Sequence, residues 1–246
     1  MDQPVIVTTE ELRGIVDAAQ LDTPAHVVVQ RLVERGWLLG TGVRGAWEFI
    51  PGSHAGAIPH GDPFLTLKAQ LAVTPDVPVR VALGSALWSL GIVDRAPSPH
   101  EVSVPSREHV PVALARSFRV VRFEPALTAS HANGLPVDRP ATVLVHLAGT
   151  PNDVRSWGEV LDALPDLIDR VDPDELVREL EGRTHATSAR LAYLLDGVAP
   201  ALLELVSVMP GPKVWFGPRR RLKRHDARWN IADTLLPRRP RATSVS

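Results

Sequence analysis

The sequence predicts an α+β protein in which a small N-terminal domain of two helices and a hairpin precedes a larger, mixed α+β domain. Three observations support this expectation. Two short amphipathic helical patterns lead into a glycine-rich hairpin within the first fifty residues. Proline, glycine and small residues then gather between Pro51 and Pro63, as they do in a linker. Beyond that stretch, short alternating runs and longer helical patterns share the chain, so we expect domains at residues 1–52 and 62–246.

The first helix is expected to begin at a capping box. Thr8 has the position of the N-cap and Glu11 that of the third helical residue, so that each side chain can bond the backbone of the other. Val7 and Leu12 have the spacing of a hydrophobic staple. Apolar residues then recur at helical spacing on one face as far as Ala19.

The second helix is expected to begin at Thr23-Pro24, with Thr23 as N-cap and the proline at the first helical position, and to run to Gly36. Its apolar and polar residues fall on opposite sides of the helical pattern. The residues expected to face a core are Ala25, Val28, Val29, Leu32 and Val33, and those expected on the other side are His26, Gln30, Arg31 and Glu34.

The stretch GTGVRG, from Gly40 to Gly45, matches the glycine spacing of a dinucleotide-binding turn. That turn must be followed by a helix, because the helix N-terminus holds the pyrophosphate. Residues 46–50 instead alternate and are rich in large residues that favour strands. The sequence therefore predicts strand, turn, strand, which is a hairpin and not a cofactor site.

Two short helices followed by a hairpin are typical of a winged helix-turn-helix, whose second helix enters the major groove while the hairpin, or wing, lies beside the backbone. Gln30 suits an adenine edge, Arg31 suits guanine O6 and N7, and Arg44 at the wing tip suits a phosphate. We interpret His26 as a surface residue, since no second metal ligand follows one turn later. A protein-docking module remains the alternative to DNA binding. The residues expected to bind DNA here are Thr23, His26, Gln30, Arg31 and Arg44.

The remaining elements are predicted from hydrophobic periodicity and from the glycine and proline residues that mark turns and loops. Two strands in the middle of the chain are expected to pair antiparallel, at 100–104 and 117–123. Two further strands are expected near the C-terminus, at 213–217 and 228–236. Helices are expected at 62–73, 81–91, 141–147, 156–168, 172–180, 187–195 and 200–208.

The composition of the 246 residues excludes several classes of protein. There are no cysteines, which excludes disulfides, zinc-thiolate sites and thiol nucleophiles. No apolar run is long enough to cross a membrane and residues 1–4 do not begin a signal peptide, so we expect a cytoplasmic protein without a membrane partner. No catalytic motif is found, so no enzyme, cofactor or metal is expected. Asp172, Asp174 and Glu175 have the pattern of a helix N-terminal turn.

The formal net charge of −1 is unevenly distributed. Residues 213–241 hold ten Lys or Arg and two Asp, a net +8, which leaves −9 for the rest of the chain. Positive charges this close together repel one another unless an anion binds beside them. The alternatives are the DNA backbone, an acidic face of a protein partner, or a merely solvated loop. The crowded loop consists of Arg219, Arg220, Arg221, Lys223 and Arg224.

The chain resembles the AbiEi-type antitoxins of abortive-infection, or type IV, toxin–antitoxin pairs. The resemblance spans nearly the whole chain and rests on five stretches: residues 5–12, 31–50 with RLVERGWLLGTGVRGAWEFI, 62–67, 83–93 with LGSALWSLGIV, and 213–236 with KVWFGPRRRLKRHDARWNIADTLL.

The resemblance implies a transcriptional autorepressor. Its winged helix would bind repeated half-sites in the promoter of its own operon, as several copies on DNA even if the free protein is a monomer. Its C-terminal domain would support neutralisation of a nucleotidyltransferase-like toxin encoded alongside. An unrecognised enzyme is the third alternative.

One departure from the family concerns the strand at Val5–Val7. Relatives usually place a helix before this strand, whereas only four residues precede it here. We expect either that the true start lies upstream or that the domain packs something else over that face.

Overall fold

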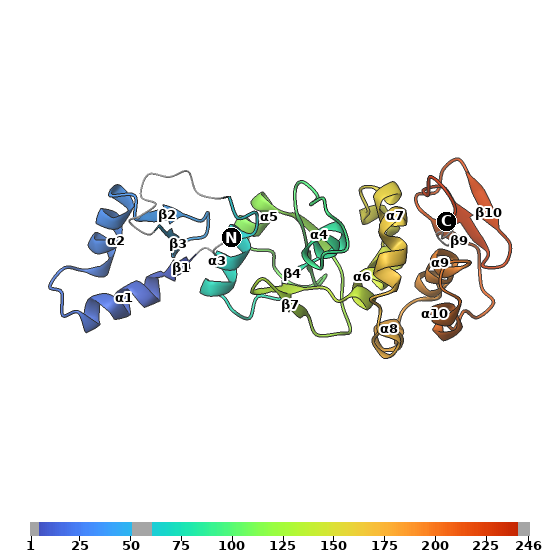
Figure 1. Cartoon of the computed structure of the whole chain (residues 1–246), viewed down its shortest axis with the longest axis horizontal. Helices are drawn as coiled ribbons and strands as arrows, with labels where there is room; N and C mark the ends of the chain where they lie inside the picture. The colour runs from blue at the N-terminus through green and yellow to red at the C-terminus, as the bar shows by residue number, and fades with distance from the viewer. Residues whose placement is uncertain (1–4, 51–60, 241–246) are drawn as a thin grey trace. The chain divides into compact units, whose positions relative to one another are not determined.

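The computed structural model describes residues 5–50 and 61–240, and they form a mixed α+β fold (Figure 1). The chain divides into two compact units. The first holds the residues up to Pro78 together with His109–Phe118, and the second holds Val79–Glu108 and the chain from Arg119 onward. The expected linker and the boundary between residues 52 and 62 fall mainly on 51–60, which lie outside the described residues.

The first unit is built on an antiparallel sheet with the strand order β1-β3-β2. Two helices, α1 and α2, stand between the first and second strands of the chain, and α3 packs against β1, β3 and α5. The bounds are β1 Val5–Thr8, α1 Thr9–Ala18, α2 Ala25–Glu34, β2 Leu38–Gly40, β3 Ala46–Phe49, α3 Leu65–Val73 and α5 Val112–Ser117.

The capping box at the start of α1 is confirmed. Thr8 Oγ1 accepts a hydrogen bond from the Glu11 backbone N–H at 3.2 Å, and a Glu11 carboxylate oxygen accepts from the Thr8 N–H at 2.7 Å. The predicted N-cap of α2 is wrong. Pro24 has an extended backbone, with ψ of 140°, so the cap lies one residue later than predicted and Thr23 caps nothing. The helix also ends at Glu34, before Gly36.

The glycine-rich stretch forms the predicted hairpin between β2 and β3. Gly42 and Gly45 have φ of 80° and 85°, which residues with a side chain rarely adopt. Thr41 Oγ1 donates to the Ala46 carbonyl at 2.9 Å and holds the turn closed. A strand and not a helix follows the turn, so the pyrophosphate-binding geometry is absent from this stretch.

The second unit contains a sheet in the order β6-β5-β4-β8-β7. The strands β5 and β6 pair parallel, which corrects the antiparallel prediction. The chain runs through α5 between them, and such a crossover returns the second strand in the same direction. The bounds are β4 Arg80–Val81, β5 Glu101–Val104, β6 Arg119–Arg122, β7 Ser130–Ala132 and β8 Leu135–Val137.

The helices of the second unit pack around α6, whose residues from Ala141 to Ala148 are all buried. This helix is apolar on every side apart from Thr142 and His146, as expected of a helix enclosed by others. Asp172 caps α8 through the N–H groups of Asp174 and Glu175, which confirms the predicted helix turn. The bounds are α4 Leu83–Ser89, α6 Pro140–Gly149, η2 Pro151–Asp153, α7 Trp157–Ile168, α8 Pro173–Leu180, α9 His185–Leu195 and α10 Pro200–Leu205.

The C-terminal basic segment is folded into a small sheet in the order β10-β11-β9. The strands are β9 Val214–Phe216, β10 Arg224–Asp226 and β11 Ile231–Asp233. The first and third lie within the predicted strands, whereas β10 was not predicted. Phe216 packs edge-on against Tyr193 of α9 and Trp157 of α7, so the sheet is attached to the core of the second unit.

Candidate nucleic-acid interface

The polar side of α2 faces solvent in the structure. His26, Gln30 and Arg31 are exposed, and the half-buried Thr23 lies in the turn that precedes the helix. The Gln30 side-chain amide donates to Glu34 Oε1 at 2.9 Å, which fixes its direction along the helix. These side chains therefore share one accessible helical face, as the sequence predicts.

The opposite side of α2 is less covered than predicted. No residue of this helix is fully buried, and Val33 is 43% exposed. Ile15 of α1 and Trp37 just after α2 are also exposed. The two helices thus keep apolar surface that the sequence pattern assigns to a core.

Arg44 lies at the tip of the hairpin and is exposed. Its neighbour Val43 is buried against Ala46 and against Ala69 of α3. Thr66 Oγ1 of α3 donates to the Thr41 carbonyl at 3.0 Å and ties the hairpin to that helix. The tip arginine is therefore displayed on a hairpin whose base is fixed.

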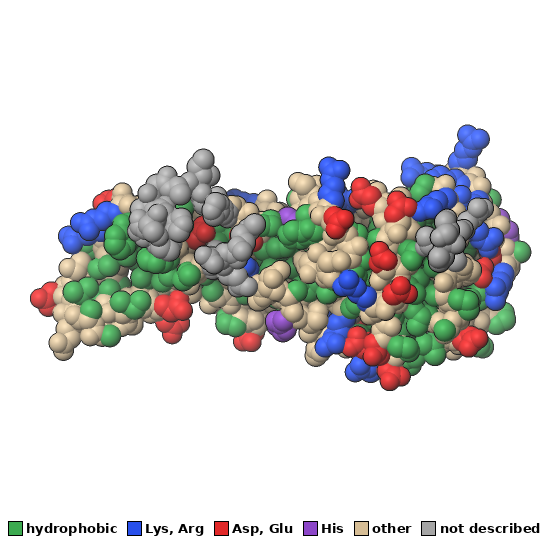
Figure 2. Space-filling view, viewed as in Figure 1, with side chains coloured by type: hydrophobic (Ala, Val, Ile, Leu, Met, Phe, Trp, Pro, Cys, Tyr) green, Lys and Arg blue, Asp and Glu red, His purple; other side chains and the backbone are tan. Residues whose placement is uncertain are grey.

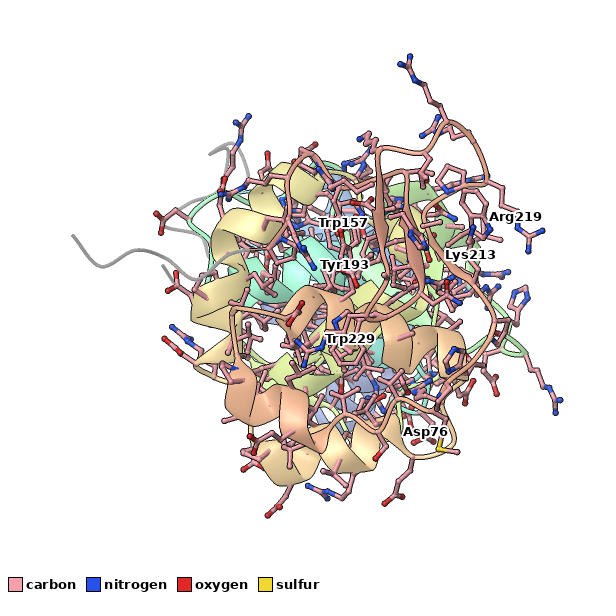
Figure 3. All side chains as sticks on the ribbon, turned by 90° about the vertical axis from the view of Figure 1, so that its right-hand side faces the viewer. Asp76, Trp157, Tyr193, Lys213, Arg219 and Trp229 are labelled. Atoms are coloured by element: carbon pink, nitrogen blue, oxygen red, sulfur yellow. The ribbon has the colours of Figure 1, made fainter. Side chains whose placement is uncertain are left out.

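The second group of predicted residues surrounds the connection between β9 and β10, at the C-terminal end of the second unit. Arg219, Arg220 and Arg221 are exposed, and none of them bonds to a side chain or carbonyl in the part of the chain that the structure describes. Figure 3 shows Arg219 pointing away from the ribbon. Lys and Arg side chains gather over this end of the second unit in Figure 2.

Lys223 and Arg224 differ from the three arginines before them, because both are used inside the protein. Arg224 donates to Asp233 Oδ2 through Nε at 2.9 Å and through Nη2 at 2.6 Å. Lys223 Nζ donates to the carbonyl of Leu235 at 3.0 Å. The sequence pattern does not distinguish these five cations, because it does not indicate which of them the Asp233 carboxylate of β11 neutralises.

Asp233 organises this part of the sheet, and the sequence analysis did not find its role. Its buried carboxylate also accepts from Tyr193 Oη at 3.2 Å and from the N–H groups of Leu235 and Leu236, both at 2.9 Å. Burial, together with the Asp233 charge, raises the pKa of Tyr193 to about 12. Burial by itself lowers the pKa of Arg224, but the hydrogen bonds and charges of Asp233 and Tyr193 together outweigh it, so that the Arg224 pKa is raised.

An open cavity of about 610 Å³ lies between this basic connection and the end of β11. Cations and apolar side chains share its walls. Its lining residues are Arg220, Arg221, Leu222, Lys223, Arg224, Thr234 and Leu235.

Other basic residues of the segment are paired with carboxylates. Arg228 bonds Asp196 at 2.8 Å, Arg239 pairs with Asp196 and Asp226, and Arg238 pairs with Asp162. Of these carboxylates, only Asp162 and Asp196 lie outside residues 213–241, so they offset two of the eight excess charges. In the described part of the segment, no ion pair is formed by Lys213, Arg219, Arg220, Arg221 or Lys223.

Two titratable groups in the core of the second unit lie away from this cavity. Burial, followed by the charges of Arg183 and Arg119, lowers the pKa of His146 to about 3, and the ring stacks on Phe123 with centroids 4.1 Å apart. Burial, opposed by Arg80, raises the pKa of Asp138 to about 7. Among the described residues, no group of carboxylates and histidines is arranged to hold a metal ion. None of the described helices is both long and apolar enough to cross a membrane.

Comparison with known proteins places the second unit in a family. A family model described as the AbiEi antitoxin C-terminal domain matches residues 79–197. No curated protein matches the chain. Among solved structures, the RV2827C protein from Mycobacterium tuberculosis is 30% identical in sequence. That match covers 96% of this chain and 88% of the mycobacterial chain, with a TM-score of 0.79.

Proposed function

Because the chain belongs to the AbiEi antitoxin family, we propose that it represses its own promoter and counters a nucleotidyltransferase-like toxin encoded in the same operon. The family is one of antitoxins and not of enzymes, and its antitoxin domain implies a toxin partner. We further propose that residues 1–52 bind DNA and that residues 62–246 carry the antitoxin function in the cytoplasm.

The observation that carries the DNA-binding proposal is the polar face of α2 beside a fixed hairpin. The order β1-α1-α2-β2-β3, with its antiparallel sheet, supports the interpretation of this unit as a winged helix-turn-helix. In this arrangement α2 enters the major groove. Gln30 and Arg31 then read base edges, while Thr23, His26 and Arg44 lie near the backbone.

The basic connection of the second unit supplies phosphate contacts in this proposal. The described part of the first unit is not strongly basic, because Glu10, Glu11, Asp17, Asp22 and Glu34 offset its arginines. Phosphate neutralisation contributes much of the affinity of DNA-binding proteins. Arg219, Arg220 and Arg221 are exposed and without partners among the described residues, so they suit this role better than Lys223 and Arg224 do.

A three-way test separates the roles of these cations. Arg219, Arg220 and Arg221 are replaced by glutamine, and both repression of a promoter reporter and rescue of cells from the toxin are measured. Lys223 and Arg224 are kept, because they bond within the protein. Loss of repression with a smaller salt dependence of DNA binding supports the backbone role. Loss of rescue with intact repression assigns the loop to the toxin, and no change in either assay identifies a solvated loop.

A protein-docking role for the first unit is the second candidate. It is favoured by one observation, the exposed apolar residues Ile15, Val33 and Trp37 on and beside the two helices. Interfaces between proteins are enriched in such side chains, whereas a DNA-binding face is polar and basic. A first unit that binds the toxin but no promoter DNA would favour this candidate.

A further inference from the structure

The open cavity beside β10 has a mainly basic lining. Its volume of about 610 Å³ is within the range that small-molecule pockets occupy. Its lining consists of residues 220–224 together with Thr234 and Leu235, which come just after β11. All of these residues belong to the second unit.

Part of the cavity lining is held in place by the protein itself. Asp233 fixes Arg224, and the carbonyls of Leu235 and Leu236 fix Lys223. Gly217, with φ of 105°, brings the chain after β9 so close to the residues after β11 that an added Cβ would lie 2.7 Å from the Leu235 Cβ. A wall that is already ordered loses little freedom when a ligand binds.

Another part of the lining carries hydrogen-bond donors that the protein does not use. The guanidinium groups of Arg220 and Arg221 make no hydrogen bond within the described residues. The same holds for the backbone N–H groups of residues 219–222. Guanidinium and successive backbone N–H groups are the donors that proteins direct at phosphate oxygens.

The charge of the lining favours a compact polyphosphate. Four cations line the cavity, namely Arg220, Arg221, Lys223 and Arg224, and Asp233 neutralises one of them. A terminal phosphate monoester carries about −1.5 to −2 near pH 7, whereas each phosphate of a nucleic-acid backbone carries one charge. A polyphosphate chain therefore places more negative charge in this small volume than a stretch of backbone does.

The cavity also offers apolar surface that phosphate alone does not need. Leu222, which stands between the arginines and Lys223 in the sequence, is 48% exposed, and Leu235 is the other leucine of the lining. We propose that the cavity binds a nucleoside triphosphate, with its phosphates on Arg220, Arg221 and the backbone N–H groups and its nucleoside against Leu222.

The proposed site shares its arginines with the proposed DNA contacts. A bound nucleotide would neutralise Arg220 and Arg221, so the same side chains would no longer be available to DNA phosphates. Nucleotide and promoter DNA then compete, and a high nucleotide level relieves repression. This consequence rests on the proposed repressor function, whereas the site itself does not.

The site is tested by calorimetric titration of the full chain with ATP and GTP, with adenosine and inorganic triphosphate as comparison ligands. We expect saturable binding of the nucleotides and none of adenosine. Arg220→Gln with Arg221→Gln should weaken nucleotide binding at least tenfold. Arg95→Gln with Arg107→Gln is the matched control, since both arginines are exposed in the same unit without partners among the described residues.

A second variant tests the nucleoside contact. Leu222→Ser should weaken ATP binding and leave inorganic triphosphate binding unchanged. Equal affinity for ATP and inorganic triphosphate, or no effect of the Arg220 and Arg221 changes, would overturn the proposed site. Circular dichroism of each variant establishes that the fold is retained.

The competition is measured by adding ATP to the promoter complex at constant ionic strength. Release of DNA by ATP but not by adenosine supports the regulatory consequence. ATP that binds without releasing DNA overturns that consequence and leaves the site in place. A protein that binds ATP but never binds its promoter contradicts the repressor function and not the nucleotide site.

Discussion

Arg31 and Arg44 lie on different elements of the first unit, so the proposal gives them different tasks on DNA. Arg31→Ala should cost about 1–3 kcal/mol on the operator and little on random DNA, because a guanine contact is lost. Arg44→Ala should weaken binding to both sequences alike, because phosphate contacts do not depend on sequence. Titrating each variant with the two DNAs measures this difference. Equal losses on both DNAs for Arg31→Ala would exclude a reading role.

The buried Asp138 gives a pH prediction for folding. Burial raises its pKa from an ordinary 3.8 to about 7, so between these values the folded protein binds a proton that the unfolded chain has lost. Stability contributed by this group is therefore present at acidic pH and falls as the pH rises toward 7. The slope is at most about 1.4 kcal/mol per pH unit.

Asp138→Asn removes this titration while keeping an oxygen that can accept from Ser103 Oγ. Urea unfolding at pH 5 and at pH 8 should show that the variant gains stability relative to the natural chain as the pH rises. If the two proteins depend on pH in the same way, Asp138 is not the titrating group.

Individual side chains show where sequence reasoning reaches its limit. The capping pair Thr8 and Glu11 was predictable, because its bonds join residues three positions apart. The neutralisation of Arg224 by Asp233 was not, because it depends on β10 lying beside β11. The sequence pattern predicts that a charged side chain is exposed, but it does not reveal an ion-pair partner on another strand.

The capping box is also testable at the scale of an element. Thr8→Ala should destabilise the first unit by about 1 kcal/mol, since the Glu11 N–H at the start of α1 loses its acceptor and the Glu11 carboxylate loses the Thr8 hydroxyl donor. Thr23→Ala is the matched control, because the Thr23 side chain caps no helix. Urea unfolding compares the two variants. A loss for Thr23→Ala as large as that for Thr8→Ala would contradict this account of the helix ends.

Most helices were predicted within a few residues, whereas strand pairing was not. A helix is determined by contacts three and four residues apart, as in α7 and α8. The parallel pairing of β5 with β6 depends on the path of the chain through α5, which local pattern does not contain. The β7–β8 hairpin was missed although Asn133-Gly134, with φ of 53° and 76°, is a strong turn signal.

At the scale of the whole molecule, the proposal requires more than one copy on DNA. A single recognition helix contacts only a few base pairs, and the operator is therefore expected to contain repeated half-sites about one helical turn apart. Sedimentation of the complex with a promoter duplex should give at least two chains per DNA. A single chain per operator at saturation would contradict this arrangement, whatever the state of the free protein.

The central claim is that this antitoxin recognises its own promoter, and the direct measurement is fluorescence anisotropy across a series of salt concentrations. The full chain is titrated into its promoter duplex and into a shuffled duplex of the same length and composition. We predict that the promoter is bound about a thousandfold more tightly or better, with affinity falling linearly in the logarithm of salt as counterions are released. Equal binding of both duplexes, without dependence on salt, would contradict the account.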